Sequence, residues 1–279
     1  MKEIRLTELL AAQYACHLRE EEKSRITIEK YLRDVRGFAR YLGSQYITKD
    51  AVIAYKQQLL NQGYALRSVN SMLAAVNSFL TFCGLTGCRV RLCRMQREIY
   101  QRSERELSRA EYLRLLRAAE GDRRLWLLMQ TICSTGIRVS ELNYFTVEAV
   151  RRGEVSVACK NKSRKILLPG KLQKLLLRYA RAIGITGGVI FRTRNGKPLD
   201  RSNIWAAMKR LCARAKIDPG KVFPHNLRKL FARTFYDLEK DIAKLADVLG
   251  HSSINTTRIY IMTTGQEHRR QLERLRLLA

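Results

Sequence analysis

Five residues along this 279-residue chain have side chains that together suit the chemistry of a phosphate ester. They are two arginines, two histidines and one tyrosine, in the order Arg138, His225, Arg228, His251 and Tyr260. Such a set can hold one phosphodiester and attack its phosphorus without a metal ion. No single member would indicate this, so the prediction rests on the order and spacing of the whole set.

Each residue type meets one requirement of phosphodiester cleavage. The planar guanidinium of arginine binds two phosphate oxygens at once and keeps its charge, so it stabilises the negative charge that grows on them. Histidine exchanges a proton near neutral pH. A tyrosine hydroxyl supplies the nucleophile once it has lost its proton, and a lysine is a mobile proton donor for the departing 5′ oxygen.

The local sequence places these side chains at the ends of helices. Pro224 marks a helix start, so His225 and Arg228, which are three residues apart, share one face of its first turn. A helix N-terminus itself favours anions. Gly250 ends the next helical stretch, and His251 follows it directly. A lone histidine in such a place is more often structural, so these stretches indicate function only in combination.

The chain is strongly basic. It has 53 Lys and Arg against 25 Asp and Glu, a formal net charge of +28, and the excess is larger after residue 105 than before it. Such a surface favours a polyanion as partner, most commonly nucleic acid, with a basic ribosome-bound protein as the alternative that charge alone leaves open. Apolar periodicity runs through both parts, so the charge belongs to folded surfaces.

The cysteines and the hydropathy of the chain indicate the cellular compartment. Seven cysteines without a signal-peptide pattern predict free thiols in the cytoplasm, and no apolar run is long enough to predict a membrane span. Cys83, Cys88 and Cys93 are evenly spaced, but zinc ligands are usually closer together and paired. We therefore expect neither a metal nor another cofactor.

The first part of the chain predicts a helical bundle. Apolar residues recur there at helical spacing, without strand alternation. Thr27 is the expected N-cap of the second helix, and Gly43 is its expected stop. The four expected helices span residues 7–21, 27–42, 49–61 and 68–83.

Residues 83–105 break this helical pattern. They carry arginines at positions 89, 91, 94, 97, 102 and 105. We interpret the end of this stretch, residues 96–105, as a basic linker whose arginines follow a phosphate backbone; a solvated connector is the alternative.

The second part predicts helices with a small sheet. It begins at Leu107, where Ser108 and Glu111 have the spacing of a capping box. A strongly apolar helix follows at residues 125–133. Residues 154–159 and 164–168 flank a lysine-rich turn and predict a β-hairpin, to which residues 189–191 would add a third strand.

The whole pattern resembles the tyrosine recombinase family, which includes phage integrases and Xer-like proteins. The resemblance covers essentially the full chain. It rests on four stretches: residues 135–142 (TGIRVSEL), residues 225–228 (HNLR), residues 249–251 (LGH) and residues 256–260 (TTRIY).

The resemblance implies a mainly α fold with two domains. Residues 1–95 would form a helical, SAM-like core-binding domain, and residues 96–105 the linker. Residues 106–279 would form a mixed α+β catalytic domain with a small antiparallel sheet and a C-terminal tail helix.

The resemblance also implies how the set would act. Tyr260 would attack the scissile phosphate and form a 3′-phosphotyrosine, releasing a 5′ hydroxyl. Arg138 and Arg228, together with His251, would hold the phosphate oxygens.

The proton donor implied by the resemblance is a lysine in the hairpin, Lys160, and His225 would assist proton transfer. The family often has glycines on both sides of this lysine, which this chain lacks, and Lys162 and Lys165 lie close by in the sequence. The position after Arg228 is often histidine in the family and is Lys229 here, but it is not part of the catalytic set.

The partners that the resemblance implies are double-stranded DNA and further copies of the chain. A homotetramer would assemble on core-type sites through the C-terminal tail, residues 266–278, with accessory DNA-bending or directionality proteins. A tail helix that packs on its own domain is the alternative. The outcome would be integration, excision, inversion or resolution, as for a mobile element, at the nucleoid. A type IB topoisomerase-like enzyme and a non-catalytic DNA-binding protein of the same fold remain as alternatives.

Overall fold

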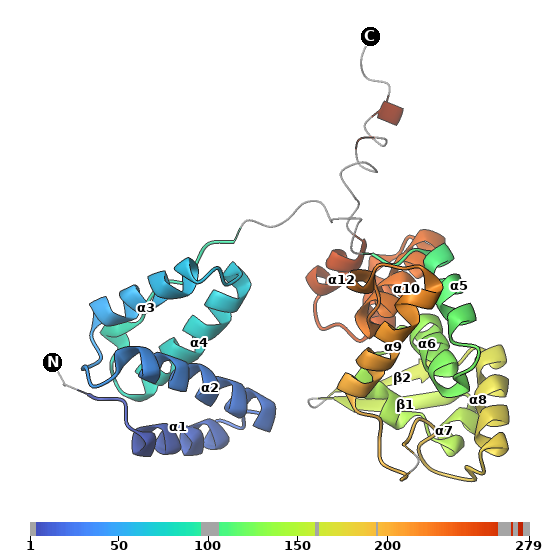
Figure 1. Ribbon diagram of the computed structural model, residues 1–279, viewed down its shortest axis with the longest axis horizontal. Coiled ribbons are helices and arrows are strands. Elements are labelled where there is room, and N and C mark those ends of the chain that lie inside the picture. Colours follow the sequence, from blue (N-terminus) through green and yellow to red (C-terminus); the bar gives the residue numbers. More distant parts are fainter. Residues whose placement is uncertain are drawn as a thin grey trace. The chain divides into compact units, whose positions relative to one another are not determined.

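The computed structural model describes residues 4–95, 106–159, 162–193, 195–261, 269 and 273–275, and it divides into two compact units, Met1–Arg97 (unit 1) and Glu98–Ala279 (unit 2) (Figure 1). The chain is mainly helical, as predicted, and its described residues form one two-stranded antiparallel sheet in unit 2. No helix in the described part of the chain is long and apolar enough to cross a membrane.

Unit 1 is a bundle of helices around an aromatic and aliphatic core. The core includes Tyr14, Phe38, Leu73 and Phe79, which are fully buried. The predicted helices are present, with bounds that shift by a few residues. They are α1 Glu8–Glu20, α2 Arg25–Leu42, α3 Lys49–Asn61 and α4 Leu66–Phe82, followed by the short 3-10 helix η1 Thr86–Cys88.

The predicted N-cap of α2 is wrong. Ser24 caps the helix, because its Oγ accepts the backbone N–H of Thr27 at 3.4 Å, and Thr27 itself lies in the first turn. Both residue types favour this position, so composition alone did not separate them. Gly43 ends α2 as predicted, with φ +59°.

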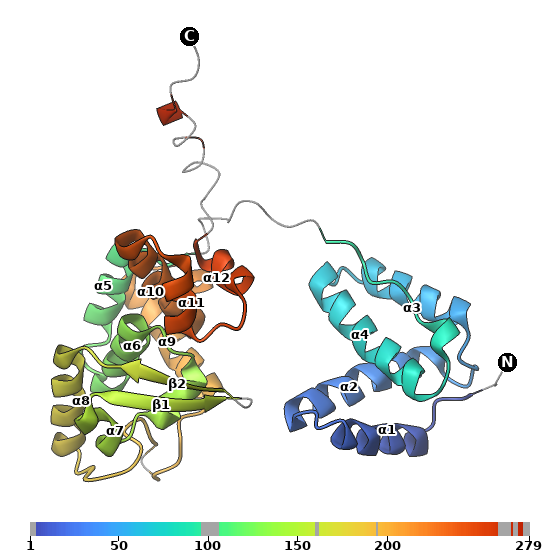
Figure 2. The same cartoon turned by 180° about the vertical axis from the view of Figure 1, so that it is seen from behind.

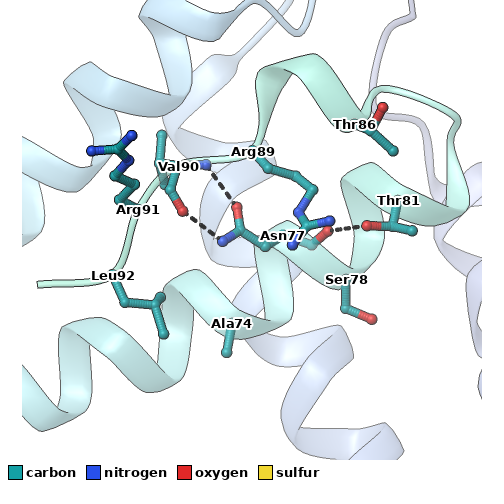
Figure 3. A pocket seen from close by; sticks show the side chains of 9 residues that line it. All are labelled: Ala74, Asn77, Ser78, Thr81, Thr86, Arg89, Val90, Arg91 and Leu92. Atoms are coloured by element: carbon teal, nitrogen blue, oxygen red, sulfur yellow. Dashed lines mark hydrogen bonds between the residues drawn. The ribbon is translucent and has the colours of Figure 1, made fainter.

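After η1, residues 89–93 form a non-helical segment that α4 holds through two asparagines. Asn77 Nδ2 donates to Val90 O at 2.8 Å, and Val90 N donates to Asn77 Oδ1 at 3.0 Å (Figure 3). Asn70, two turns earlier on α4, makes the same pair of bonds with Cys93, at 2.9 and 2.7 Å. Each asparagine side chain thus pairs with both the backbone N–H and the backbone C=O of one residue, as a neighbouring β-strand would.

Two lysines of α3 hold the same segment. Lys49 Nζ donates to the carbonyl of Arg89, and Lys56 Nζ donates to that of Arg91 at 2.9 Å. Both arginine side chains line a groove of about 670 Å³ along α4 and η1, and none of its lining residues is acidic (Figure 3). The predicted linker itself, residues 96–105, lies outside the described residues.

Unit 2 surrounds the apolar helix α6. This helix packs against α8, α9 and α10, and it contributes Leu127, Leu128 and Ile132 to the core. The elements of unit 2 are α5 Arg109–Ala118, α6 Arg123–Thr135, η3 Val139–Tyr144, α7 Val147–Arg152, β1 Glu154–Cys159, β2 Lys162–Leu167, α8 Gly170–Ala182, α9 Arg201–Ala215, η4 Pro219–Lys221, α10 Pro224–Glu239, α11 Ile242–Leu249 and α12 Ile254–Ile261.

Helices α10, α11 and α12 gather at one end of unit 2, while α7 and α8 lie at the other (Figures 1 and 2). α10 contacts both α11 and α12, and α11 contacts α12. The capping box predicted for α5 is confirmed: Ser108 Oγ accepts from Glu111 N at 3.2 Å, and Glu111 Oε2 accepts from Ser108 N at 2.8 Å.

The predicted hairpin is confirmed, but its third strand is wrong. β1 and β2 pair antiparallel from Glu154 opposite Leu167 to Cys159 opposite Lys162. Val189 forms only an isolated bridge with Thr146, because the backbone around it bonds to the connection between η3 and α7 and not to the hairpin. The apolar run at 189–191 reflects a buried loop, with both Ile190 and Phe191 in the core.

Candidate active site

Arg138 follows a chain reversal at the end of α6. Gly136 ends this helix with φ +64°, and an added Cβ would lie 2.3 Å from Phe231 Cδ1 and 2.9 Å from Leu249 Cδ2, so only glycine fits. Arg138 then caps η3. Its backbone N donates to Glu141 Oε2 at 2.7 Å, and its Nη1 donates to Glu141 Oε1 at 3.0 Å. The Arg138 side chain remains 42% exposed, whereas Glu141 is buried.

Arg228, in the second turn of α10, is buried and joins three segments. Its Nη1 donates to Gly136 O, and its Nη2 donates to Leu249 O at 2.8 Å and to His251 Nε2 at 2.9 Å. Burial and then the charge of Arg138 lower the pKa of Arg228, but an arginine stays protonated at neutral pH all the same. Arg228 therefore holds the chain before Arg138 and the chain before His251 against one helix.

Tyr260 of α12 contacts both histidines. Its ring centroid lies 5.4 Å from that of His251, with the planes 13° apart, and 5.4 Å from that of His225, with the planes 47° apart. His225 follows Pro224 at the start of α10, as predicted, and is exposed. His251 follows Gly250, which ends α11 with φ +64°. Tyr260 itself is 6% exposed.

The hydrogen bonds of His251 define its tautomer. An arginine only donates, so His251 Nε2 accepts from Arg228 and carries no proton. Nδ1 then carries the proton and donates it to Thr257 Oγ1 at 2.8 Å. Burial, followed by the charges of nearby arginines, lowers the pKa of His251 to about 4. Desolvation and nearby cations also lower the pKa of His225, so both imidazoles are neutral at pH 7.

One cavity of about 530 Å³ in unit 2 brings the set together. Arg138, His225, Arg228 and Tyr260 all line it, and His251 contacts two of these residues. The cavity offers the exposed guanidinium of Arg138 and the buried one of Arg228, beside the phenol of Tyr260 and the neutral imidazole of His225. Chemically, this combination suits an anionic ester whose charge increases during nucleophilic attack.

Four residues of the site were not identified from the sequence. Glu141 lies in the TGIRVSEL stretch, and its spacing of three from Arg138 could have indicated the ion pair. Arg164 of β2 donates from Nη2 to Glu141 Oε2 at 2.6 Å, and no local pattern indicates a contact over 23 residues. Arg201 and Trp205, one turn apart on α9, line the cavity, and nothing in the sequence marks them.

The predicted hairpin lysine, Lys160, lies outside the described residues, so its role stays a prediction. The last described pair of the hairpin is Cys159 with Lys162. Lys165, another lysine of the hairpin, binds Glu154 instead, with Nζ 3.2 Å from Oε1 and a side chain that is 68% exposed.

The predicted tail contact also falls outside the described residues, apart from residues 269 and 273–275. Cys83, Cys88 and Cys93 pack against the core of unit 1. Within the part of the chain that the structure describes, no group of three or more His, Cys, Asp or Glu side chains could hold a metal ion.

Comparison with known proteins relates both units to one family. A model of the phage integrase family matches residues 105–267, and a model of the phage integrase N-terminal SAM-like domain matches residues 11–84. Tyrosine recombinase XerA of Pyrococcus furiosus is 29% identical, over 100% of this chain and 98% of the relative. Tyrosine recombinase XerD of Xanthomonas axonopodis pv. citri is 30% identical, over 88% and 90%.

The fold matches solved structures of the same kind. A lambda integrase tetramer bound to a Holliday junction superposes with a TM-score of 0.74, at 20% identity, over 93% of this chain and 78% of that one. The N-terminal SAM-like bundle and the mixed second unit are thus both shared with lambda integrase. The chain therefore belongs to the phage integrase family and is a tyrosine recombinase.

Proposed function

We propose that this tyrosine recombinase cleaves and rejoins double-stranded DNA at specific sites through a 3′-phosphotyrosine intermediate, with Tyr260 as the nucleophile. The observation that carries the proposal is the position of Tyr260. Its ring contacts His225 and His251, and it lines the same cavity as Arg138 and Arg228. A phosphate entering this cavity would meet a nucleophile, the neutral imidazole of His225 and two guanidinium groups together.

The first chemical step exchanges one phosphate ester for another. The Tyr260 hydroxyl oxygen bonds to phosphorus, and the bond from phosphorus to the 5′ oxygen breaks. The leaving oxygen takes a proton from Lys160. Attack by the 5′ hydroxyl of a partner strand on the phosphotyrosine reverses the step and joins new DNA ends. Each step keeps the number of phosphate ester bonds constant, so no nucleoside triphosphate is consumed.

The two histidines take different parts in this step. His225 is neutral and exposed on the cavity, so it is suited to accept the proton that leaves Tyr260. His251 uses its Nε2 lone pair to hold Nη2 of Arg228, so in this state it positions the guanidinium. It donates to a phosphate oxygen only after Nε2 has gained a proton.

Arg138 and Arg228 stabilise the charge that grows on the non-bridging oxygens. Both are permanent cations, and both line the cavity. By analogy with oxyanion donors in other enzymes, loss of either would raise the barrier by roughly 3–4 kcal/mol, which is a rate loss of about 10²–10³.

We further propose that the substrate is held by several copies of the chain. The net charge of +28 suits contact with many phosphates, and affinity should fall steeply with salt. The lambda integrase of similar fold is a tetramer on a Holliday junction. By this analogy the chain acts as a homotetramer on DNA, in which the C-terminal tail contacts a neighbouring copy, and DNA-bending or directionality proteins assist.

The nucleophile is tested by trapping the covalent intermediate. A target site is first selected from a pool of random duplexes, and the protein is then incubated with a nicked form of that site. We expect a protein–DNA band on a denaturing gel that is absent in Tyr260→Phe. Tyr236→Phe is the matched control, because the Tyr236 ring lies under Lys240 Nζ and does not line the cavity. A band that persists in Tyr260→Phe would refute the assignment.

The reaction products separate recombination from DNA relaxation. Two sites on one plasmid should yield recombined junctions, with deletion or inversion of the segment between them. A topoisomerase-like enzyme would give relaxed plasmid with no new junction, and a non-catalytic protein would give neither product.

A further inference from the structure

Two side chains of α9 line the candidate active site but have no part in the proposed chemistry. Arg201, at the start of the helix, and Trp205, one turn later, line the cavity that also holds Tyr260. Both residues are exposed, and Trp205 is 50% exposed despite its large apolar ring. Residues at this spacing lie side by side on a helix, so the cavity wall presents a guanidinium next to an aromatic ring.

Arg201 differs from the other two arginines of the cavity. Arg138 donates to Glu141 Oε1, and Arg228 donates to the carbonyl of Leu249. Among the residues that the structure describes, the Arg201 side chain has neither a hydrogen-bond acceptor nor an acidic partner. Its charge lies close enough to His225 to contribute to the lowered pKa of that imidazole. A cation in this position has donors available for a ligand beside the proposed reacting groups.

The described lining of the cavity carries more positive charge than one phosphodiester needs. It includes three arginines and one acidic residue, Asp200. Asp200 caps α9, because its Oδ1 accepts from Ser202 N at 2.7 Å. Under the proposed function, Arg138 and Arg228 bind the scissile phosphate, which has a single negative charge. Arg201 is therefore suited to a second phosphate.

The Trp205 ring is held by the next turn of α9. Lys209 Nζ lies over this ring, 5.0 Å from its centroid, and also donates to the carbonyl of Pro219. The cation–π contact fixes one side of the ring, while the exposed part remains open to a ligand. In a DNA duplex the base faces are stacked on one another, whereas the deoxyribose rings lie beside the phosphates. The apolar surface that this ring can meet is therefore that of a sugar.

We propose that Arg201 and Trp205 form a binding subsite for the nucleotide next to the scissile phosphate. Arg201 binds the adjacent phosphate, and Trp205 packs against the deoxyribose between the two phosphates. This inference rests on the proposed function, in which the scissile phosphate occupies the cavity beside Tyr260. The subsite holds the strand so that the scissile phosphate stays in line with the tyrosine hydroxyl. Its contacts go to phosphate and sugar, so it acts on any base sequence.

Neutral phosphate analogues test the contact of Arg201. A methylphosphonate has a methyl group in place of one non-bridging oxygen and lacks the negative charge. It is placed in turn at each of the two phosphates that flank the scissile one, and covalent complex formation is timed at saturating protein. At one of these positions it should slow the unchanged protein roughly 10- to 100-fold, the usual effect of losing a hydrogen bond to a charged group.

Arg201→Ala should show the same loss on unmodified DNA. At the sensitive position, the methylphosphonate should then slow this variant by no more than about threefold further, because the two changes remove one contact. Arg210→Ala is the matched control, since Arg210 is an exposed arginine of the same helix that lines a different cavity. It should respond to both methylphosphonates as the unchanged protein does.

The contact of Trp205 is tested at the nucleotide between the two phosphates. An abasic residue keeps the deoxyribose and lacks the base, whereas a propanediol spacer lacks both. The spacer should slow the unchanged protein more than the abasic residue does. In Trp205→Ala this difference should shrink roughly fivefold or more, in the range of other aromatic contacts with nucleotides. Trp205→Phe keeps an aromatic ring and should retain part of the difference.

The outcomes separate this inference from the proposed function. If Arg201→Ala and the methylphosphonates slow cleavage independently at both positions, the phosphate contact is wrong. An equal spacer effect in Trp205→Ala and the unchanged protein would overturn the sugar contact, as would a loss of the Trp205 effect on abasic DNA. In each case a covalent band that depends on Tyr260 leaves the function standing. A band that persists in Tyr260→Phe removes the function and this inference with it. Thermal melting of each variant shows that it folds.

Discussion

Substitution of Gly136 by alanine tests how the candidate active site is held together. This glycine ends α6 with φ +64°, and its carbonyl accepts a hydrogen bond from Arg228. A Cβ added at this position would lie 2.3 Å from Phe231 Cδ1 and 2.9 Å from Leu249 Cδ2. The substitution therefore strains the backbone and forces apart the α6–α10–α11 contact.

The two effects have separate magnitudes. Left-handed backbone costs alanine about 1–2 kcal/mol relative to glycine. Overpacking a tight contact adds about 1–3 kcal/mol, for a sum of about 2–5 kcal/mol in the unfolding free energy of unit 2. At about 2–4 °C per kcal/mol for a unit of this size, the melting temperature should fall by about 4–20 °C.

Gly153→Ala provides the control that isolates the steric part. Gly153 also has a positive φ, +77°, but its nearest contact to an added Cβ is Gln173 Nε2 at 3.6 Å. Thermal unfolding followed by circular dichroism should therefore show a smaller loss, of about 1–2 kcal/mol, from the backbone alone. DNA cleavage should fall in Gly136→Ala and not in Gly153→Ala. Equal losses of stability in the two variants would refute the steric argument.

Two further predictions concern His251 and the asparagines of α4. The pKa of His251 is about 4 in the folded protein and about 6.5 in the unfolded chain, so its contribution to the free energy of unfolding is complete above pH 6.5, and up to about 3 kcal/mol is lost as the pH falls to 4. When the free energy of unfolding is measured in urea between pH 4 and 7, it should change less with pH in His251→Asn than in the unchanged protein. The same pH dependence in both proteins would contradict this. Asn77→Ala leaves the backbone N–H and C=O of Val90 without a partner, so urea unfolding should show a loss of about 1–3 kcal/mol in the free energy of unfolding of unit 1. Asn61→Ala is the control, because Asn61 Oδ1 accepts only from Gln57 on an exposed face, and this substitution should change the free energy of unfolding by less than about 0.5 kcal/mol.

The parts of the site that sequence could predict are those with local signals. His225 and Arg228 lie three residues apart in the helix that begins at Pro224, and Gly250 marks the helix end before His251. The helices of unit 1 were predictable for the same reason, because their apolar residues recur with a period near 3.6, which can be recognised within a short stretch of sequence.

The parts that sequence could not predict depend on contacts between distant segments. No sequence pattern distinguishes Arg164 from the many other basic residues of the chain. Only the fold brings it close to Glu141 and Val248. The prediction of a third strand was wrong because residues 189–191 are apolar for burial in a loop. A short apolar run has the same sequence pattern in a buried loop as in a buried strand. The prediction of Thr27 as the N-cap was wrong because Ser24, three residues earlier, can also cap the helix and does so.

Three arginines in and around this site already have acceptors within the protein. Arg164 and Arg228 bind the successive carbonyls of Val248 and Leu249, where the negative end of the α11 dipole lies, and Glu141 binds Arg138. Of these arginines, Arg138 and Arg228 line the cavity, so a phosphate that enters it would compete with the Glu141 carboxylate and the Leu249 carbonyl for their N–H groups. A free phosphate or sulfate ion has little to offer in that competition. A phosphate within DNA has the binding energy of the rest of the duplex behind it, so under the proposed function the site would favour the polymer over the ion.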